Sequence, residues 1–154
     1  MLRKTALAVA IMAATCSVQA AKEKNVTIEL LGTYKAVTDE GEGLFDEGAA
    51  EVVAHDPVTQ RLFVINAGAS VVDVLDVSDP TNPARVFGID VKEDLPDAGG
   101  INSVAVKNGL VAVAVENDLK TEDGWAAFYD TDGNAISQIP AGALPDAITF
   151  THNG

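Results

Sequence analysis

Residues 101–115 read INSVAVKNGLVAVAV, and the fold follows from this stretch. Asn108 and Gly109 stand between two apolar runs, and an Asn-Gly pair in a two-residue loop is the strongest short hairpin signal, because both residues accept the positive φ of a type I′ turn. The turn fixes the register of the two strands and places Val104 opposite Val113. One face of the predicted hairpin then carries valines and the other carries alanines.

Neither face of this hairpin is polar, so the hairpin must be covered on both sides. A face of large side chains and a face of small ones suit a sheet that lies between two other sheets. The alternative at this point is the central hairpin of a β-sandwich. The pattern of strands and turns in the rest of the chain decides between a stack of several sheets and a β-sandwich.

The chain divides into units of four short strands, which alternate with polar turns rich in Gly, Pro, Asn and Asp. The turn at 79–83, DPTNP, cannot be part of a strand because its prolines lack ladder donors. We predict one unit with strands at 49–56, 61–66, 71–77 and 84–91, and a second with strands at 101–107, 110–115, 125–130 and 135–140.

A third copy of the unit begins near the end of the sequence. DAITF at 146–150 aligns with NSVAV at 102–106 and with EVVAH at 51–55. Val53 and Val104 are 51 residues apart, and Val104 and Ile148 are 44 apart, which is the length of a four-stranded propeller blade. A sandwich has no reason to repeat in this way. We therefore predict an all-β protein, a β-propeller of four-stranded antiparallel blades, with two complete blades and the start of a third.

Two blades cannot close a ring, so we expect residues 21–154 to be the N-terminal part of a longer propeller domain, with seven blades in the full ring. The missing C-terminal part would then be required for folding. The alternating segment VTIELLGTY at 26–34 is predicted to be the outermost strand of the last blade, contributed from the N-terminus.

Residues 1–20 have the order of features of a signal peptide. Arg3 and Lys4 precede an apolar run at 5–14, and the small-residue site at 18–20 predicts cleavage after residue 20. The apolar run is too short to span a membrane, so we predict no transmembrane segment. The sequence therefore predicts an exported protein, located in the periplasm or outside the cell.

Composition excludes several classes of function. Removal of Arg3 and Lys4 would leave 8 of the 10 basic residues against 23 acidic ones, a formal charge near −15, so nucleic acid is not an expected partner. Cys16 is the single cysteine and lies in the predicted leader, which leaves no thiol for a disulfide or for catalysis. Asp132 and Gly133 in DTDGN predict a hairpin turn, since the segment lacks the ligand pattern of an EF-hand.

Oxygen-bearing side chains recur where first strands begin and second strands end, positions that open on one rim of a propeller channel. Carboxylate and amide oxygens are the ligands that Ca²⁺ prefers. We predict a calcium site at this rim, or alternatively strand ends that are polar because they meet solvent. The residues are Glu51, Asn66, Asn102, Glu116 and Asp146.

Four segments resemble the choice-of-anchor I proteins, secreted or surface-attached bacterial β-propellers. They are FDEGAAEVVAHDPVTQRLFVINA at 45–67, VDVLDVSDPTNPARV at 72–86, INSVAVKNGLVAVAVE at 101–116 and GALPDAITFTHNG at 142–154. The resemblance covers residues 28–154, and the SDPTNP turn is also similar to LVIVD-type propeller repeats. The resemblance implies a propeller fold. Because members are often labelled alkaline phosphatase or phytase-like esterase, it also implies an esterase activity.

Two functions remain open from the sequence. The first is a scaffold that binds a small-molecule or protein ligand, with a cation at the channel mouth. The second is a metal-dependent hydrolase, a phosphoesterase or a lactonase, in which Glu51, Glu116 and Asp146 hold the metal. The sequence does not identify a catalytic nucleophile, and whether the protein is an enzyme stays open.

Overall fold

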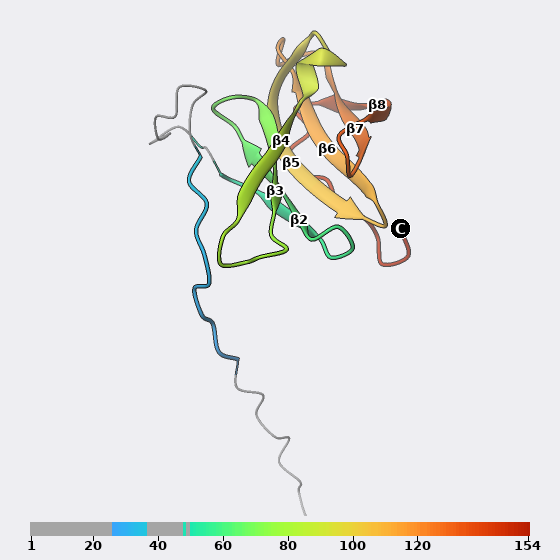
Figure 1. The fold of residues 1–154 in the computed structure, drawn as a ribbon. Helices are drawn as coiled ribbons and strands as arrows, with labels where there is room; N and C mark the ends of the chain where they lie inside the picture. The colour runs from blue at the N-terminus through green and yellow to red at the C-terminus, as the bar shows by residue number, and fades with distance from the viewer. Residues whose placement is uncertain (1–25, 37–47, 49) are drawn as a thin grey trace, which may run out of the picture.

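The structure is a computed structural model that describes residues 26–36, 48 and 50–154. Its strands form two four-stranded antiparallel sheets, and the described residues contain no α-helix (Figure 1). The predicted all-β class and the two predicted four-stranded units are therefore confirmed. The signal peptide predicted at residues 1–20 lies outside the described residues. Within the described ranges, no helix has the length and apolarity needed to cross a bilayer.

Each sheet consists of four consecutive strands in chain order. A single turn of 3-10 helix, η1 (Val91–Glu93), connects the two sheets. The first sheet contains β1 (Val53–Asp56), β2 (Arg61–Asn66), β3 (Val71–Asp76) and β4 (Ala84–Asp90). The second contains β5 (Ala98–Lys107), β6 (Leu110–Asn117), β7 (Asp123–Asp130) and β8 (Ala135–Ala143).

The hairpin of β5 and β6 forms as the sequence predicts. Asn108 has a φ of 52° and Gly109 a φ of 80°, the left-handed pair that a type I′ turn requires. The register is also confirmed, since Val104 pairs with Val113. Valines and alanines therefore lie on opposite faces of this hairpin.

All four strands of the second sheet extend further than predicted, β6 and β7 by two residues and β5 and β8 by three. β5 begins at Ala98, because the pair Gly99 and Gly100 lets the chain make an irregular step before regular pairing resumes. β8 continues through Pro140 to Ala143, which is possible because it is the outermost strand and its free edge needs no N–H donor.

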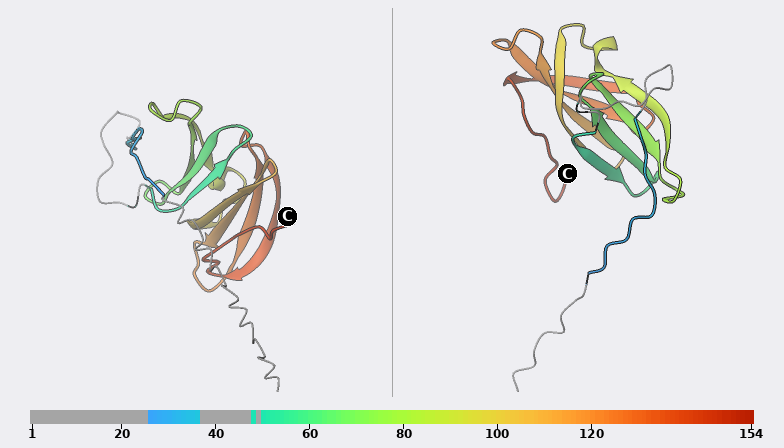
Figure 2. Two further views of the ribbon diagram at one scale, coloured as in Figure 1. Left: turned by 90° about the horizontal axis from the view of Figure 1, so that it is seen from below. Right: turned by 90° about the vertical axis from the view of Figure 1, so that its left-hand side faces the viewer.

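Two segments expected to be strands are not strands in the structure: residues 26–34, and residues 147–151, the first strand of the predicted third copy. Each segment runs singly beside the face of a sheet rather than along a sheet edge (Figure 2). Its backbone groups therefore have no neighbouring ladder to join, and a strand needs such a partner. The alternation of side chains was identified correctly, but the pairing that it predicts is not made.

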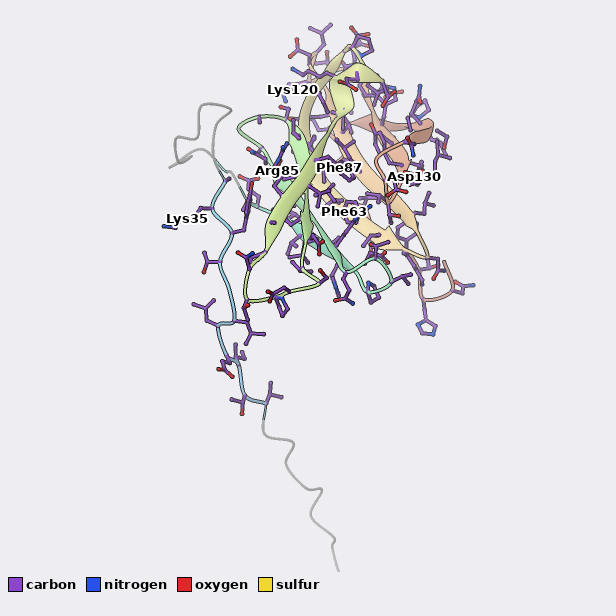
Figure 3. The ribbon with its side chains drawn as sticks, viewed as in Figure 1. Lys35, Phe63, Arg85, Phe87, Lys120 and Asp130 are labelled. Atoms are coloured by element: carbon purple, nitrogen blue, oxygen red, sulfur yellow. The ribbon has the colours of Figure 1, made fainter. Side chains whose placement is uncertain are left out.

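The two sheets stack face to face around one apolar core, and Phe63 and Phe87 lie between them (Figure 3). The core side chains of β2 and β3 alternate with residues that face away from the second sheet, as expected for strands with one inner face. The core of the first sheet is Phe63, Ile65, Val72, Val74 and Ile89. The core of the second sheet is Ile101, Val104, Val111, Val113, Val115, Ala127 and Tyr129.

The two faces that meet are different faces of the repeat. β-pairing aligns Val64 with Val113, and therefore Phe63 with Ala112. We call the side that carries Phe63 and Ala112 the leading face, and the side that carries Val64 and Val113 the trailing face. The leading face of the first sheet packs on the trailing face of the second. Head-to-tail stacking of this kind can continue from unit to unit and closes a ring when the rotation permits.

Residues 145–154 continue the head-to-tail stacking of the two sheets. Ile148, which the repeat aligns with Val104, lines a shallow hollow with Ala112 and Phe128 on the leading face of the second sheet. Val104 takes the equivalent place in the core beside the leading face of the first sheet. The predicted third copy thus lies where the first strand of a next unit would lie, although it forms no strand.

Tyr129 places an unpartnered hydroxyl in the core. The residue is 2% exposed, and among the described residues its Oη has no hydrogen-bond partner. Burial, and then the nearby charge of Asp94, raise the pKa of Tyr129 to about 12. The Asp94 carboxylate lies close to the hydroxyl but outside hydrogen-bonding geometry.

We expect Tyr129→Phe to leave the free energy of unfolding unchanged or to raise it by about 1 kcal/mol, because it removes a buried polar atom without a partner. The folded state holds the phenolic proton more tightly than the unfolded state, so stability from this group is complete below about pH 10 and is lost as the pH rises toward 12. Urea unfolding at about pH 8 and about pH 11 should therefore show a smaller alkaline loss in the variant. Equal alkaline losses in both proteins would contradict this account.

Candidate functional site

The strand-start end of the molecule is the end at which β1 and β5 begin and β2 and β6 finish, at the top in Figure 1. All five residues predicted for the calcium site belong to segments at this end. Their immediate contacts differ, and these contacts decide which of them are free to meet a ligand.

Glu51 and Asn102 lie at the same irregular step in the two sheets. The Glu51 N–H donates to the Ile65 carbonyl at 3.2 Å, while the Ile65 N–H donates to the Val52 carbonyl at 2.9 Å, so that two residues oppose one. In β5 the register shifts around Asn102 in the same way. Such bulges re-aim a side chain at a strand end. The structure therefore gives Glu51 and Asn102 equivalent positions, as the aligned sequences predict.

Asn102 reaches from the second sheet to the third copy of the repeat. Its Nδ2 donates to the Pro145 carbonyl at 3.0 Å. Pro145 precedes Asp146, the residue that the repeat aligns with Glu51 and Asn102, and Asp146 is exposed. The amide nitrogen of Asn102 thus positions the chain next to Asp146 and leaves the Oδ1 of Asn102 as its possible ligand atom.

Glu116 is neutralised by a neighbour. Its carboxylate forms an ion pair with Lys120 Nζ at 2.5 Å, and its side chain is 14% exposed. The carboxylate also lies against Gly100, where an added Cβ would come within 2.5 Å of its Oε1. Glu116 therefore already has a cation, and its contribution to a metal site would require Lys120 to move.

Asn66 is 5% exposed and has structural partners on the trailing face of the first sheet. Its Oδ1 accepts from the Ala69 N–H at 3.2 Å, and its Nδ2 donates to Asp73 Oδ2 at 3.3 Å. Asp73 in turn pairs with Arg85 Nε at 2.6 Å. Asn66 therefore holds the turn between β2 and β3 and helps to satisfy a buried carboxylate.

The structure accordingly brings Glu51, Asn102 and Asp146 to successive starts of the repeat but commits Asn66 and Glu116 to other partners. Among residues 26–36, 48 and 50–154, no group of three or more His, Cys, Asp or Glu side chains is arranged to hold a metal ion. The calcium site therefore stays a prediction, and the residues that can still support it are the three strand-start residues.

Further contacts tie each unit to the next one along the chain. The Ser70 hydroxyl donates to the Gly99 carbonyl at 3.3 Å. Lys107 Nζ donates to the carbonyls of Thr151 and His152, at 2.5 and 2.6 Å. These side chains were not identified from the sequence, because a surface lysine or serine gives no signal until the neighbouring unit is placed. Each of these contacts joins one unit to the unit that follows it in the sequence, as head-to-tail stacking requires.

The DTDGN segment is a hairpin turn, as predicted, and its carboxylates have partners. Asp130 Oδ1 accepts from the N–H groups of Asp132 and Asn134, both at 2.9 Å, and the hydrogen bond from the Asn134 side chain holds the pKa of Asp130 below its usual value. Arg61 of the first sheet donates to Asp132 Oδ1 at 2.8 Å and to the Thr131 carbonyl at 2.5 Å. The turn is therefore a contact between the sheets.

An acidic hollow of about 650 Å³ lies at the strand-start end of the second sheet. It forms because the loop after β6 folds back on the start of β5, with the Asp118 N–H donating to the Asp97 carbonyl at 2.9 Å. The sequence predicted only a polar loop here. Clustered carboxylates in a concave site raise the local concentration of cations. The lining is Asp97, Asn117, Asp118, Leu119, Glu122, Asp123, Trp125 and Pro140.

Comparison with known families gives one match. Residues 51–154, more than half of the chain, match the family described as "Choice-of-anchor I domain". No curated protein matches the sequence. The matched range contains both sheets and the segment that follows them.

Proposed function

The chain belongs to the choice-of-anchor I family, and from this premise we propose that its two sheets are successive blades of a β-propeller that works as a ligand-binding or interaction scaffold. The family places the chain among β-rich domains of cell-surface or exported proteins. Location in the periplasm or outside the cell, with the predicted leader as the export signal, is part of the proposal.

The observation that carries this proposal is the repeated strand start. The same bulge presents Glu51 in one sheet and Asn102 in the next. The Asn102 side chain in turn donates a hydrogen bond to the carbonyl of Pro145, the residue before Asp146. Because the sheets stack head to tail, equivalent residues of successive units recur at one end of the molecule. Propellers offer such an end to ligands as the mouth of a central channel.

We further propose that this end binds Ca²⁺ through oxygens of Glu51, Asn102 and Asp146. Both carboxylates lie on exposed residues, so a cation could approach them without displacing a protein partner. Oxygen ligands from separate segments, with part of the shell completed by water, are usual for Ca²⁺. The acidic hollow beside this end adds to the negative potential that would attract the ion.

Calorimetry of the full chain with calcium and with a chelator tests this. Ligand at about one hundred times its Kd stabilises the native state by about 2.7 kcal/mol, which moves Tm upward by several degrees. We expect Glu51→Gln to reduce the calcium-dependent shift. The matched control is Glu29→Gln, which changes an exposed carboxylate of residues 26–36, outside the strand-start end.

Identical midpoints with calcium and with chelator, or equal reductions by both substitutions, would contradict the calcium site. Calcium-dependent hydrolysis of a generic phosphomonoester by the same protein would instead support the hydrolase that the family resemblance implies. Binding without turnover supports the scaffold.

A further inference from the structure

Each unit has a carboxylate at the strand-start end that lies directly against a glycine. An added Cβ on Gly48 would come within 2.6 Å of Glu51 Oε1, and one on Gly100 within 2.5 Å of Glu116 Oε1. Both glycines come shortly before the first strand of their unit becomes regular. Because a larger residue would push the carboxylate away, glycine permits this close approach in both units.

The two carboxylates come from different strands of the repeat but take neighbouring places in it. Strand pairing aligns the two units so that Asn102 stands where the first unit has Glu51, and Glu116 stands where the first unit has Ala67. The Ala67 N–H donates to the Gly48 carbonyl at 3.0 Å, so this second-strand position also lies beside the glycine. Each unit therefore keeps one carboxylate here, from its first strand in one case and from its second strand in the other.

The two carboxylates differ in their partners. Glu116 forms the 2.5 Å ion pair with Lys120 Nζ, whereas Glu51 has no ion pair in the part of the chain that the structure describes. The difference comes from the loop that follows the second strand, because AGAS at 67–70 has no cation and DLKTE at 118–122 contains Lys120. Lys120 lies at the strand-start end in Figure 3. The second unit thus carries its own tethered cation at this place.

The Lys120 ammonium can leave the carboxylate without a change in the loop backbone. The Leu119 N–H donates to Asn117 Oδ1 at 2.9 Å, and the Glu122 N–H donates to the Leu119 carbonyl at 2.8 Å, so other contacts hold the loop. The Lys120 side chain is 56% exposed. Its neighbours Asp118 and Glu122 line the acidic hollow, and neither has an ion-pair partner among the described residues. An exposed lysine between two acidic places can change partner at a small electrostatic cost.

We propose that Lys120 is a built-in competitor of Ca²⁺ at the strand-start end. When Ca²⁺ binds, it takes the Glu116 carboxylate as a further ligand, and the Lys120 ammonium moves to the acidic hollow. Both cations cannot contact the same carboxylate closely, because they repel each other at short range. The ion pair therefore lowers the apparent calcium affinity by the fraction of molecules in which Glu116 is already occupied. This inference rests on the proposed calcium site and names the group that regulates it.

Isothermal titration of the full chain with Ca²⁺ tests the competition. Lys120→Met removes the competing charge and keeps an apolar side chain, so we expect Ca²⁺ to bind at least about threefold more tightly. Lys120→Arg keeps the charge and should bind Ca²⁺ no more tightly than the unchanged protein. The matched control is Lys92→Met, which removes the same charge from an exposed lysine of η1 that has no ion pair among the described residues. It should change Kd by less than about twofold, because salt screens a charge that does not contact the site.

A double substitution shows whether Lys120 acts through Glu116. In a Glu116→Gln protein the contested carboxylate is absent, so adding Lys120→Met should give no more gain in affinity than Lys92→Met gives. A gain that persists in this background, or equal gains from the two lysine substitutions, would overturn the proposal, because Lys120 would then act only through overall charge. Calcium binding that Lys120→Met leaves unchanged would overturn the competition alone. The absence of binding in every variant would overturn the proposed calcium site as well.

Discussion

Phe63→Ala is expected to lower the free energy of unfolding by about 3–5 kcal/mol, the range for a fully buried aromatic ring. Phe63 is 0% exposed and belongs to the core that both sheets share. The substitution removes apolar area from the interface and leaves a cavity that the sheets, each held by its own ladder, can close only in part. Urea unfolding of the full chain followed by circular dichroism measures the loss.

Val58→Ala is the control for this prediction, because Val58 is 84% exposed in the turn between β1 and β2. A surface change of this kind should alter the free energy of unfolding by less than about 0.5 kcal/mol. If Phe63→Ala is as mild as the control, the two sheets do not depend on each other for stability. They would then be separate units and not neighbours in a stack.

Arg85→Met is expected to cost about 2 kcal/mol, because it leaves the carboxylate of Asp73 without its cation. Asp73 is 4% exposed, and Arg85 Nε lies 2.6 Å from its Oδ1. After the substitution, the Asn66 amide at 3.3 Å is the remaining donor seen on this carboxylate. The estimate is below the range for a fully buried pair because the Arg85 side chain is 45% exposed and water can replace part of its effect.

The double substitution Asp73→Ala with Arg85→Met is the control. The repeat aligns Asp73 with Ala127 of the second sheet, so an alanine is already accepted at this position of the unit. Removing both charges should therefore recover most of the stability that Arg85→Met loses. A double variant as unstable as the single one would show that Arg85 stabilises the sheet through other contacts and not through Asp73.

The repeat and the hairpins could be predicted from the sequence because their signals are local. Asn108-Gly109 fixes a register within a few residues, and the two-fold alternation on each side then assigns the faces. Turn residues such as those at 79–83 separate the strands in the same local manner. Most errors at strand ends come from β-bulges and glycines, where pairing continues irregularly and periodicity fades.

The candidate site could be predicted only in part. Alignment of the repeats correctly made Glu51 and Asn102 equivalent. It could not show that Asn66 forms a hydrogen bond with Asp73 or that Glu116 forms an ion pair with Lys120. The first contact depends on the pairing of β2 with β3, and the second on the path of the loop after β6. The acidic hollow was missed for the same reason, since the loop containing Asp118 meets the start of β5 only in three dimensions.

The segments at 26–34 and 147–151 show another limit of sequence reasoning. Their alternation is real, but a strand also needs a partner, and the partner is a property of the assembled fold. Each segment nevertheless lies on the sheet face that head-to-tail stacking assigns to it. Periodicity therefore identified both segments as extended chain, and their membership of neighbouring units stays a prediction.

The stacking of the leading face of the first sheet on the trailing face of the second is the central claim, and methyl-labelled nuclear magnetic resonance tests it most directly. The account predicts nuclear Overhauser effects from the Phe63 ring to methyl groups of Val111 and Val113, and from the Ala112 methyl to Ile148. Effects from the Phe63 ring to the Ala112 methyl, with none to the valines, would contradict it, because the sheets would then meet through the same face of the repeat.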